Sequence, residues 1–219
     1  MQQRKHSSIN LRIMEIASVI DIATLKRRGR SLEFFTIAWN SLEGLIAILA
    51  GALAGSISLV GFGIDSLVEV TSGTALLWRM SSATEDESRE RLSLRIVGMC
   101  FLLLAIYIAY EAIKSLLHGT APERSVVGIV LACVSLIVMP LLSRAKHKIA
   151  TGLNSSAMHA DAKQTEFCTY LSAILLAGLL LNASLGWWWA DPAAALVMVP
   201  IIAREGVEGL QGKACVDCR

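Results

Sequence analysis

Six apolar stretches alternate with short polar segments along the 219-residue chain. Most of them are about 20 residues long, the length at which a helix crosses a hydrocarbon core about 30 Å thick. They cover residues 34–54, 55–79, 94–117, 125–142, 172–185 and 191–203. A helix satisfies its own backbone hydrogen bonds in lipid, which an open strand does not. The pattern therefore predicts an all-α fold, a bundle of six transmembrane helices.

Prolines mark the ends of two of these stretches. Pro140 is expected to bend or end the fourth helix, because proline removes a backbone hydrogen bond. Arg144, Lys146 and Lys148 would then begin a basic loop. Asp191-Pro192 is typical of a helix start, with Asp as the N-cap and Pro in the first turn.

The polar segments divide the chain into three parts. Residues 1–31 form an N-terminal segment, residues 32–210 the transmembrane domain, and residues 211–219 a short tail. Isoleucines recur at helical spacing in the first part, which favours an amphipathic helix on the membrane surface: Ile9, Ile13, Ile16 and Ile20.

Lysine and arginine are concentrated on one side of the predicted topology. They gather in the N-terminal segment, the second-to-third loop, the fourth-to-fifth loop and the C-terminal tail. An even number of spans places these segments together, and basic segments stay in the cytoplasm. We therefore predict an integral protein of the cell (inner) membrane with both termini cytoplasmic.

Composition supports a membrane protein and excludes several other classes. The chain is 54% hydrophobic and 17% charged, and its net charge of +2 is too small to indicate nucleic-acid binding. An intramembrane hydrolase would need an activated nucleophile or histidine-rich zinc ligation, and none of the four histidines lies in an apolar stretch. We expect no enzyme activity, no catalytic residues and no resident cofactor. Three cysteines fall in or near apolar runs and are expected to be buried free thiols: Cys100, Cys133 and Cys168.

Two acids inside the second stretch indicate its chemistry. Asp65 and Glu69 are four residues apart, so a helix places both carboxylates on one face. A charge at bilayer depth costs about 2.5–3.5 kcal/mol on insertion scales, and such residues usually mark an ion path. The pair predicts half of a cation site, with the other half on another helix.

Glu43 in the first stretch is a third acid at similar depth. At about 1.5 Å of rise per residue, Glu43 lies about 18 Å from the turn at Gly55, and Asp65 and Glu69 about 15 and 21 Å. Two roles remain open for Glu43: a neighbour of the cation site, or a protonated side chain or one hydrogen-bonded to Asn40.

The segment GSISLVGFGIDSLVEV resembles the second transmembrane helix of cation diffusion facilitators. That helix begins with a G-S-x-[SA] turn and carries a metal-binding [HD]-x-x-x-D, which Asp65-x-x-x-Glu69 matches with Glu as its second acid. The Gly-Trp turn and the Asp191-Pro192-x-Ala-Ala start of the last helix also match, so the resemblance covers about residues 32–210. It implies a secondary transporter that exports a divalent metal cation by proton antiport.

The family usually pairs this helix with an H-x-x-x-D motif in the fifth helix, where the present chain departs from the pattern. One register places Asp161 on a family Ala/Ser-Asp-Ala sequence, and the other places Glu166 on the family Asp. We expect Glu166 to be a metal ligand and Asp161 to be an access residue or second ligand. Thr165 and Cys168 could supply further donors.

The ligand types leave the metal open. Carboxylate-rich sites suit Mn²⁺ or Fe²⁺, whereas a thiolate from Cys168 would favour zinc or cadmium, and zinc is the family majority. The tail carries Cys215-x-x-Cys218, which could capture a soft metal or could simply be frayed.

Family members usually carry a cytoplasmic C-terminal ferredoxin-like domain that dimerises. We expect this chain to lack that domain, so that a homodimer would form through the spans or loops. The alternative function is a non-transporting membrane protein that binds metal or acts as a scaffold.

Overall fold

The computed structural model describes residues 2–81, 87–119 and 122–211, with side chains undescribed at 2–21, 79–81, 87–94, 96, 97, 156 and 157. Within these ranges the chain forms six helices and no strand, which confirms the predicted all-α fold. They are α1 (Gln2–Ala54), α2 (Ile57–Ser81), α3 (Glu87–His118), α4 (Val126–Leu153), α5 (Ser156–Leu185) and α6 (Ala190–Leu210).

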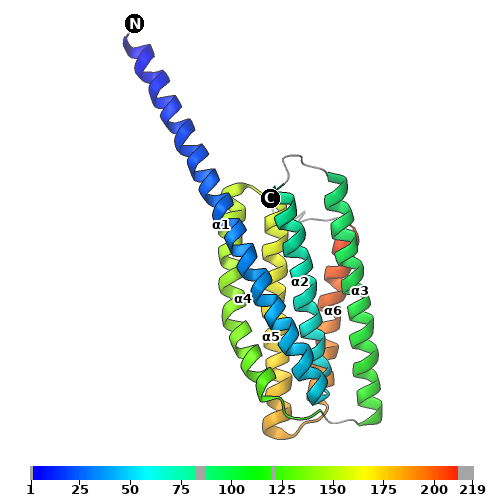
Figure 1. Ribbon diagram of the computed structural model, residues 1–219. Helices are drawn as coiled ribbons and strands as arrows, with labels where there is room; N and C mark the ends of the chain where they lie inside the picture. Colours follow the sequence, from blue (N-terminus) through cyan, green and yellow to red (C-terminus); the bar gives the residue numbers. More distant parts are fainter. Residues whose placement is uncertain (1, 82–86, 120–121, 212–219) are drawn as a thin grey trace.

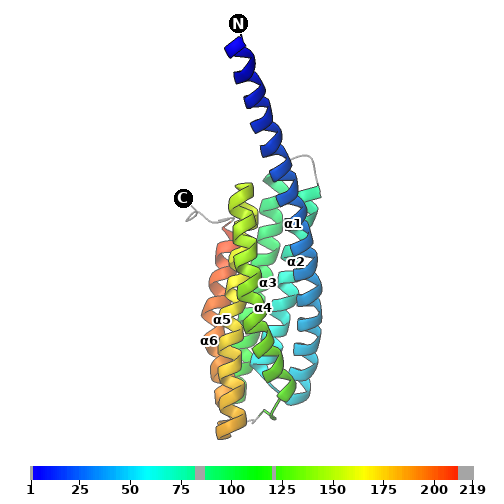
Figure 2. The same ribbon diagram turned by 90° about the vertical axis from the view of Figure 1, so that its left-hand side faces the viewer.

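The helices run up and down in one elongated bundle (Figures 1 and 2). The most extensive packing joins α1 to α2, α3 to α6 and α4 to α5. Helix α2 also contacts α3, α5 and α6, which makes it the central element. Helix α1 starts, and α6 ends, at the same end of the bundle, which we call the terminal end; the opposite end is the turn end. The side of the membrane that each end faces stays a prediction.

Helix α1 is continuous through the expected boundary at residue 31, and its first part extends beyond the bundle (Figures 1 and 2). The isoleucines of the expected amphipathic segment lie outside the described side chains. The Cys215-x-x-Cys218 motif lies outside the described residues altogether.

Five of the six helices are long and apolar enough to cross a membrane: α1 from Ile22, α2 to Trp78, α3 from Gly98, α4 to Leu153 and α5 from Met158. Large apolar side chains such as Leu53, Ile106 and Ile137 point outward, as lipid-facing residues do. The chain is an integral membrane protein. Helix α6 is more polar, with Arg204, Glu205 and Glu208 near its end, yet it packs along α3 inside the same bundle.

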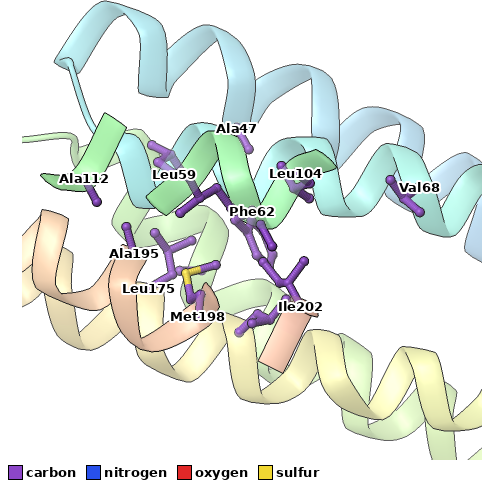
Figure 3. Packing of buried hydrophobic residues seen from close by; sticks show 14 of the residues in the cluster. Ala47, Leu59, Phe62, Val68, Leu104, Ala112, Leu175, Ala195, Met198 and Ile202 are labelled. Carbon is purple, nitrogen blue, oxygen red and sulfur yellow. The ribbon is translucent and has the colours of Figure 1, made fainter. Parts of the chain in front are cut away.

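The bundle interior is closed by interlocking apolar side chains around α2 (Figure 3). Phe62 of α2 is fully buried and packs in one cluster with Leu104 of α3, Leu175 of α5 and Met198 of α6. Because this cluster joins all six helices, it fixes the orientation of the α2 face that carries the acids.

Glycines let α1 and α2 approach closely. A Cβ at Gly63 would lie 2.9 Å from the backbone nitrogen of Ile48, and one at Gly51 would lie 2.8 Å from that of Val60. The turn between the helices is made by Gly55, whose φ of 66° is a left-handed conformation that favours glycine.

Asp191 holds the start of α2 rather than the start of its own helix. Its carboxylate accepts hydrogen bonds from Ser56 Oγ (2.6 Å), the backbone nitrogen of Ile57 (2.9 Å) and Ser58 Oγ. The expected N-cap role in α6 is therefore wrong: α6 starts after Trp189, which makes no side-chain capping bond. The first backbone N–H groups of a helix need acceptors and attract negative charge, and the buried Asp191 supplies both from a neighbouring helix.

Helix α4 does not end at Pro140. It continues to Leu153, so the expected basic loop is the last part of a helix. Its buried positions continue at helical spacing through Met139, Leu142, Lys146 and Ile149, and this packing against α5 holds the helix together past the proline.

We predict that Asp191→Ala lowers the unfolding free energy by about 2–3 kcal/mol, because it removes the acceptor of the Ser56 and Ser58 hydroxyls and of the first backbone N–H groups of α2. Denaturant titration of the purified protein in detergent measures the change. Asp191→Asn keeps one acceptor oxygen and should lose less. Equal stability of Asp191→Ala and the unmodified protein would contradict the capping role.

Candidate cation site

Asp65 and Glu69 lie on the buried face of α2 that points toward α5. The two residues are one helical turn apart and only 3% and 1% exposed. The sequence prediction that both carboxylates share one interior face is confirmed by this placement. Neither side chain reaches solvent or lipid, so their partners must come from within the bundle.

Helix α5 supplies those partners. The thiol of Cys168 donates to Glu69 Oε2 at 2.8 Å and lies 3.2 Å from Asp65 Oδ2. The hydroxyl of Thr165 donates to Glu69 Oε1 at 2.6 Å. Both α5 residues are buried, Thr165 at 0% and Cys168 at 2% exposure. We call these four residues the α2–α5 cluster.

The cluster contains two carboxylates, a thiol and a hydroxyl, all donor types that bind divalent transition metals. In the described part of the chain, no three His, Cys, Asp or Glu side chains are spaced as around a metal ion. The thiol–carboxylate distances are also shorter than in a metal site, because oxygen and sulfur ligands of a tetrahedral ion stand about 3.5 Å apart. A cation would have to separate the thiol from the carboxylates by roughly half an ångström.

Glu43 of α1 borders this cluster. Its Oε2 accepts a hydrogen bond from Ser66 Oγ at 3.2 Å, and Ser66 lies beside Asp65 in α2. Depth counting along the helices therefore placed Glu43 correctly. One of the alternatives for Glu43, a hydrogen bond to Asn40, is not formed: both polar side-chain atoms of Asn40 and Oε1 of Glu43 are buried without a hydrogen-bond partner among the described residues.

Glu166 lies on a different face of α5 from the cluster. Its side chain is 48% exposed, accepts a hydrogen bond from Tyr170 and lies 3.7 Å from His147 of α4. The structure does not bring Glu166 to Asp65. Two positions along α5 already turn the helix by about 200°, so Cys168 faces the cluster where Glu166 cannot.

Asp161 lies one turn from Thr165 and is buried, but it faces α4. Its Oδ2 forms an ion pair with Lys146 Nζ at 2.5 Å, and Lys146 also lies 3.3 Å from Glu33 Oε2 of α1. All three are almost completely buried. This Glu33–Lys146–Asp161 network joins α1, α4 and α5 and was missed at the sequence level, where Lys146 was assigned to a loop.

Gln164 and Cys168 form the α5 pair that both sequence registers missed. They are four residues apart, and both line a narrow cavity with Asp65. This is the same i, i+4 spacing as Asp65 and Glu69 on the facing helix. A third register of α5, with Gln164 and Cys168 at the pair positions, would have found them. The expectation of buried thiols holds for Cys168 alone, since Cys100 and Cys133 face outward.

The sequence matches the cation efflux transmembrane domain over residues 34–210, more than three quarters of the chain. The chain belongs to the cation efflux family. That span agrees with the range of about 32–210 predicted from the second-helix motif, the Gly-Trp turn and the last helix start.

Three relatives illustrate the range of the cation efflux family. An uncharacterized transporter of Methanocaldococcus jannaschii is 30% identical, covering 77% of this chain and 62% of its own length. The magnetosome protein MamB of Paramagnetospirillum magneticum is 28% identical, covering 72% of this chain and 56% of its own length. The cation-efflux pump FieF of Shewanella oneidensis is 25% identical, with 74% and 58% covered. The chain thus spans less than two thirds of the length of these curated relatives.

We predict that Lys146→Met lowers the unfolding free energy by about 3–5 kcal/mol, because it leaves two buried carboxylates without a cation. The triple variant Glu33→Gln, Lys146→Met, Asp161→Asn removes every charge of the network and should recover most of the loss. Denaturant titration in detergent measures both. Lys114→Met, at a 52% exposed side chain, is the control and should change stability by less than about 0.5 kcal/mol. If Lys146→Met is as stable as this control, the network is not what holds these helices together.

Proposed function

We propose that this chain is a secondary transporter that exports a divalent transition-metal cation through the α2–α5 cluster. The observation that carries the proposal is the convergence of Asp65 and Glu69 of α2 with Cys168 of α5, all at least 97% buried. Burying two carboxylates and a thiol in an apolar bundle costs free energy, and apolar side chains would fill the same space without that cost. Cation binding accounts for all three groups.

Family membership supports the direction of transport. One relative is named a cation-efflux pump, and another an uncharacterized transporter. Each is a longer chain than the one described here, so the activity is proposed for this chain on its own residues.

Exchange of the metal for protons follows from the chemistry of the cluster. A thiol binds a metal as thiolate, so the proton that Cys168 donates toward Glu69 must leave when the metal arrives. When the metal leaves, the same group takes up a proton again. When the metal is released on one side of the membrane and the proton is taken up there, the two ions cross in opposite directions, which is antiport.

The position of Cys168 supports a proposal about the metal, which the sequence left open. Mn²⁺ and Fe²⁺ suit sites made of oxygen donors, whereas a thiolate favours zinc and cadmium. Because Cys168 lies between both carboxylates, we propose zinc or a similarly thiophilic ion as the substrate.

In liposomes with a pH gradient, the purified chain should move Zn²⁺ against its concentration gradient. The double variant Asp65→Ala, Glu69→Ala should reduce this flux to the level of empty liposomes, because the metal then has no carboxylate to bind. Glu111→Ala, at an ion pair outside the cluster, is the matched control and should keep normal flux. Retained flux in the double variant would contradict the proposal. Metal binding by the unmodified chain without any flux would favour the non-transporting alternative.

Exchanging the thiol tests the substrate class separately. Cys168→Asp makes the cluster oxygen-only, so the ratio of Zn²⁺ to Mn²⁺ flux should fall by about tenfold or more, the scale of changes at metal sites. Competition between the two ions in the same liposomes measures the ratio. Cys133→Ser, at an outward-facing thiol, should leave the ratio unchanged. An unchanged ratio in Cys168→Asp would show that the thiol does not select the metal.

A further inference from the structure

A narrow cavity reaches the α2–α5 cluster from the side of α3 and α6, two helices that supply no residue of the cluster. It lies between α2, α3, α5 and α6, and Asp65 and Cys168 form its inner wall. Two polar side chains complete the lining, Gln164 of α5 and Glu205 of α6, and the remaining lining is apolar. Glu205 is therefore a third carboxylate with access to the cluster, on a helix that supplies no member of it.

Two polar atoms in the lining of this cavity lack partners. Nε2 of Gln164 and Oε1 of Glu205 are buried, and neither has a hydrogen-bond partner in the described part of the chain. Buried polar atoms are usually satisfied, and each exception calls for an explanation such as an ion or a ligand. The unpartnered Glu205 oxygen can coordinate a partly hydrated cation directly, whereas Gln164 Nε2 is a hydrogen-bond donor and can hold only a water of the hydration shell.

The position of Glu205 along the bundle follows from Asp191. Because Asp191 binds the first residues of α2, the two helices start at the same level and run in the same direction. Asp65 lies eight residues after Ile57, and Glu205 lies fourteen after Asp191. At about 1.5 Å per residue, Glu205 is about 9 Å closer to the terminal end than Asp65. A cation that comes from that end passes Glu205 first.

The buried carboxylates between α1, α4 and α5 already have a cation as their partner. The ammonium group of Lys146 lies between Glu33 of α1 and Asp161 of α5. This ammonium group occupies the two carboxylates that would otherwise receive a metal ion. Asp161 is therefore not suited to the access role that the sequence suggested.

We propose that Glu205, assisted by Gln164, is the loading site through which a divalent cation reaches the α2–α5 cluster from the terminal end. The inference rests on the proposed function, because it assumes that the cluster binds the cation. Glu205 acts on the rate of loading: its charge concentrates the cation at the cavity and passes it to Asp65 and Cys168. It does not contribute to the bound state.

The test measures loading directly. In a chain whose only cysteine is Cys168, Cd²⁺ binding is followed by stopped-flow through the ultraviolet absorption of the cadmium–thiolate bond. Glu205→Gln should lower the second-order rate constant about three- to tenfold, at the lower end of the range for electrostatic steering, with the same final absorption. Glu205→Asp keeps the charge and should retain most of the rate. Glu208→Gln is the matched comparison, since Glu208 lies on the same helix, pairs with Arg204 and is not part of the cavity lining, and its rate should fall less than that of Glu205→Gln.

Flux in liposomes gives a second readout. Glu205→Gln should raise the half-saturating Zn²⁺ concentration about three- to tenfold and leave the maximal rate unchanged. A lower maximal rate at the same half-saturating concentration would indicate a structural role and overturn the inference. So would normal Cd²⁺ loading in Glu205→Gln, or equal slowing in Glu208→Gln. If the parent chain shows no cadmium–thiolate absorption, the proposed cluster itself fails, and the loading role fails with it.

Discussion

Burying a carboxylate in an apolar bundle is the constraint on which this structure depends. Among the described residues, six carboxylates are buried inside the bundle: Glu33, Glu43, Asp65, Glu69, Asp161 and Asp191. Each would be costly alone at this depth, so the helices are arranged to bring partners to them. The pairing of α1 with α4, of α2 with α5 and of α2 with α6 can each be traced to at least one such carboxylate.

The partners differ in kind, and the difference separates structural acids from functional ones. Asp191 is fully satisfied by backbone and serine donors, and nothing else could enter without breaking the α2 start. Asp161 is neutralised by a fixed lysine. Among the described residues, Asp65 and Glu69 accept hydrogen bonds from a thiol and a hydroxyl alone; the thiol can lose its proton, and the hydroxyl can rotate its hydrogen away. Of these three kinds of partner, a cation can displace only the thiol and the hydroxyl.

The sequence predicted correctly the features that depend on one helix alone. Length and apolarity predicted six helices, and the i, i+4 spacing of Asp65 and Glu69 placed them on one interior face. Predictions failed where the partner belongs to another helix. Asp191 was expected to cap its own helix and caps α2, and Lys146 was assigned to a loop although apolar positions continue around it at helical spacing. The α5 residue that meets Asp65 depends on the rotation of α5 in the bundle, which the local sequence does not contain, and so Cys168 was only one of several candidates.

The attachment of α6 to α2 by Asp191 has a mechanical consequence. The two helices are fastened at their first residues, at the turn end of the bundle, while the polar part of α6 lies far from this point. Roughly 21 Å of helix separate Asp191 from Glu205. A tilt of about 5° at the fixed end would move the far part of α6 by about 2 Å, close to the diameter of a bare metal ion. Because that far part is packed closely against α3 at Gly98, opening a passage of ionic width there requires α3 to move together with α6.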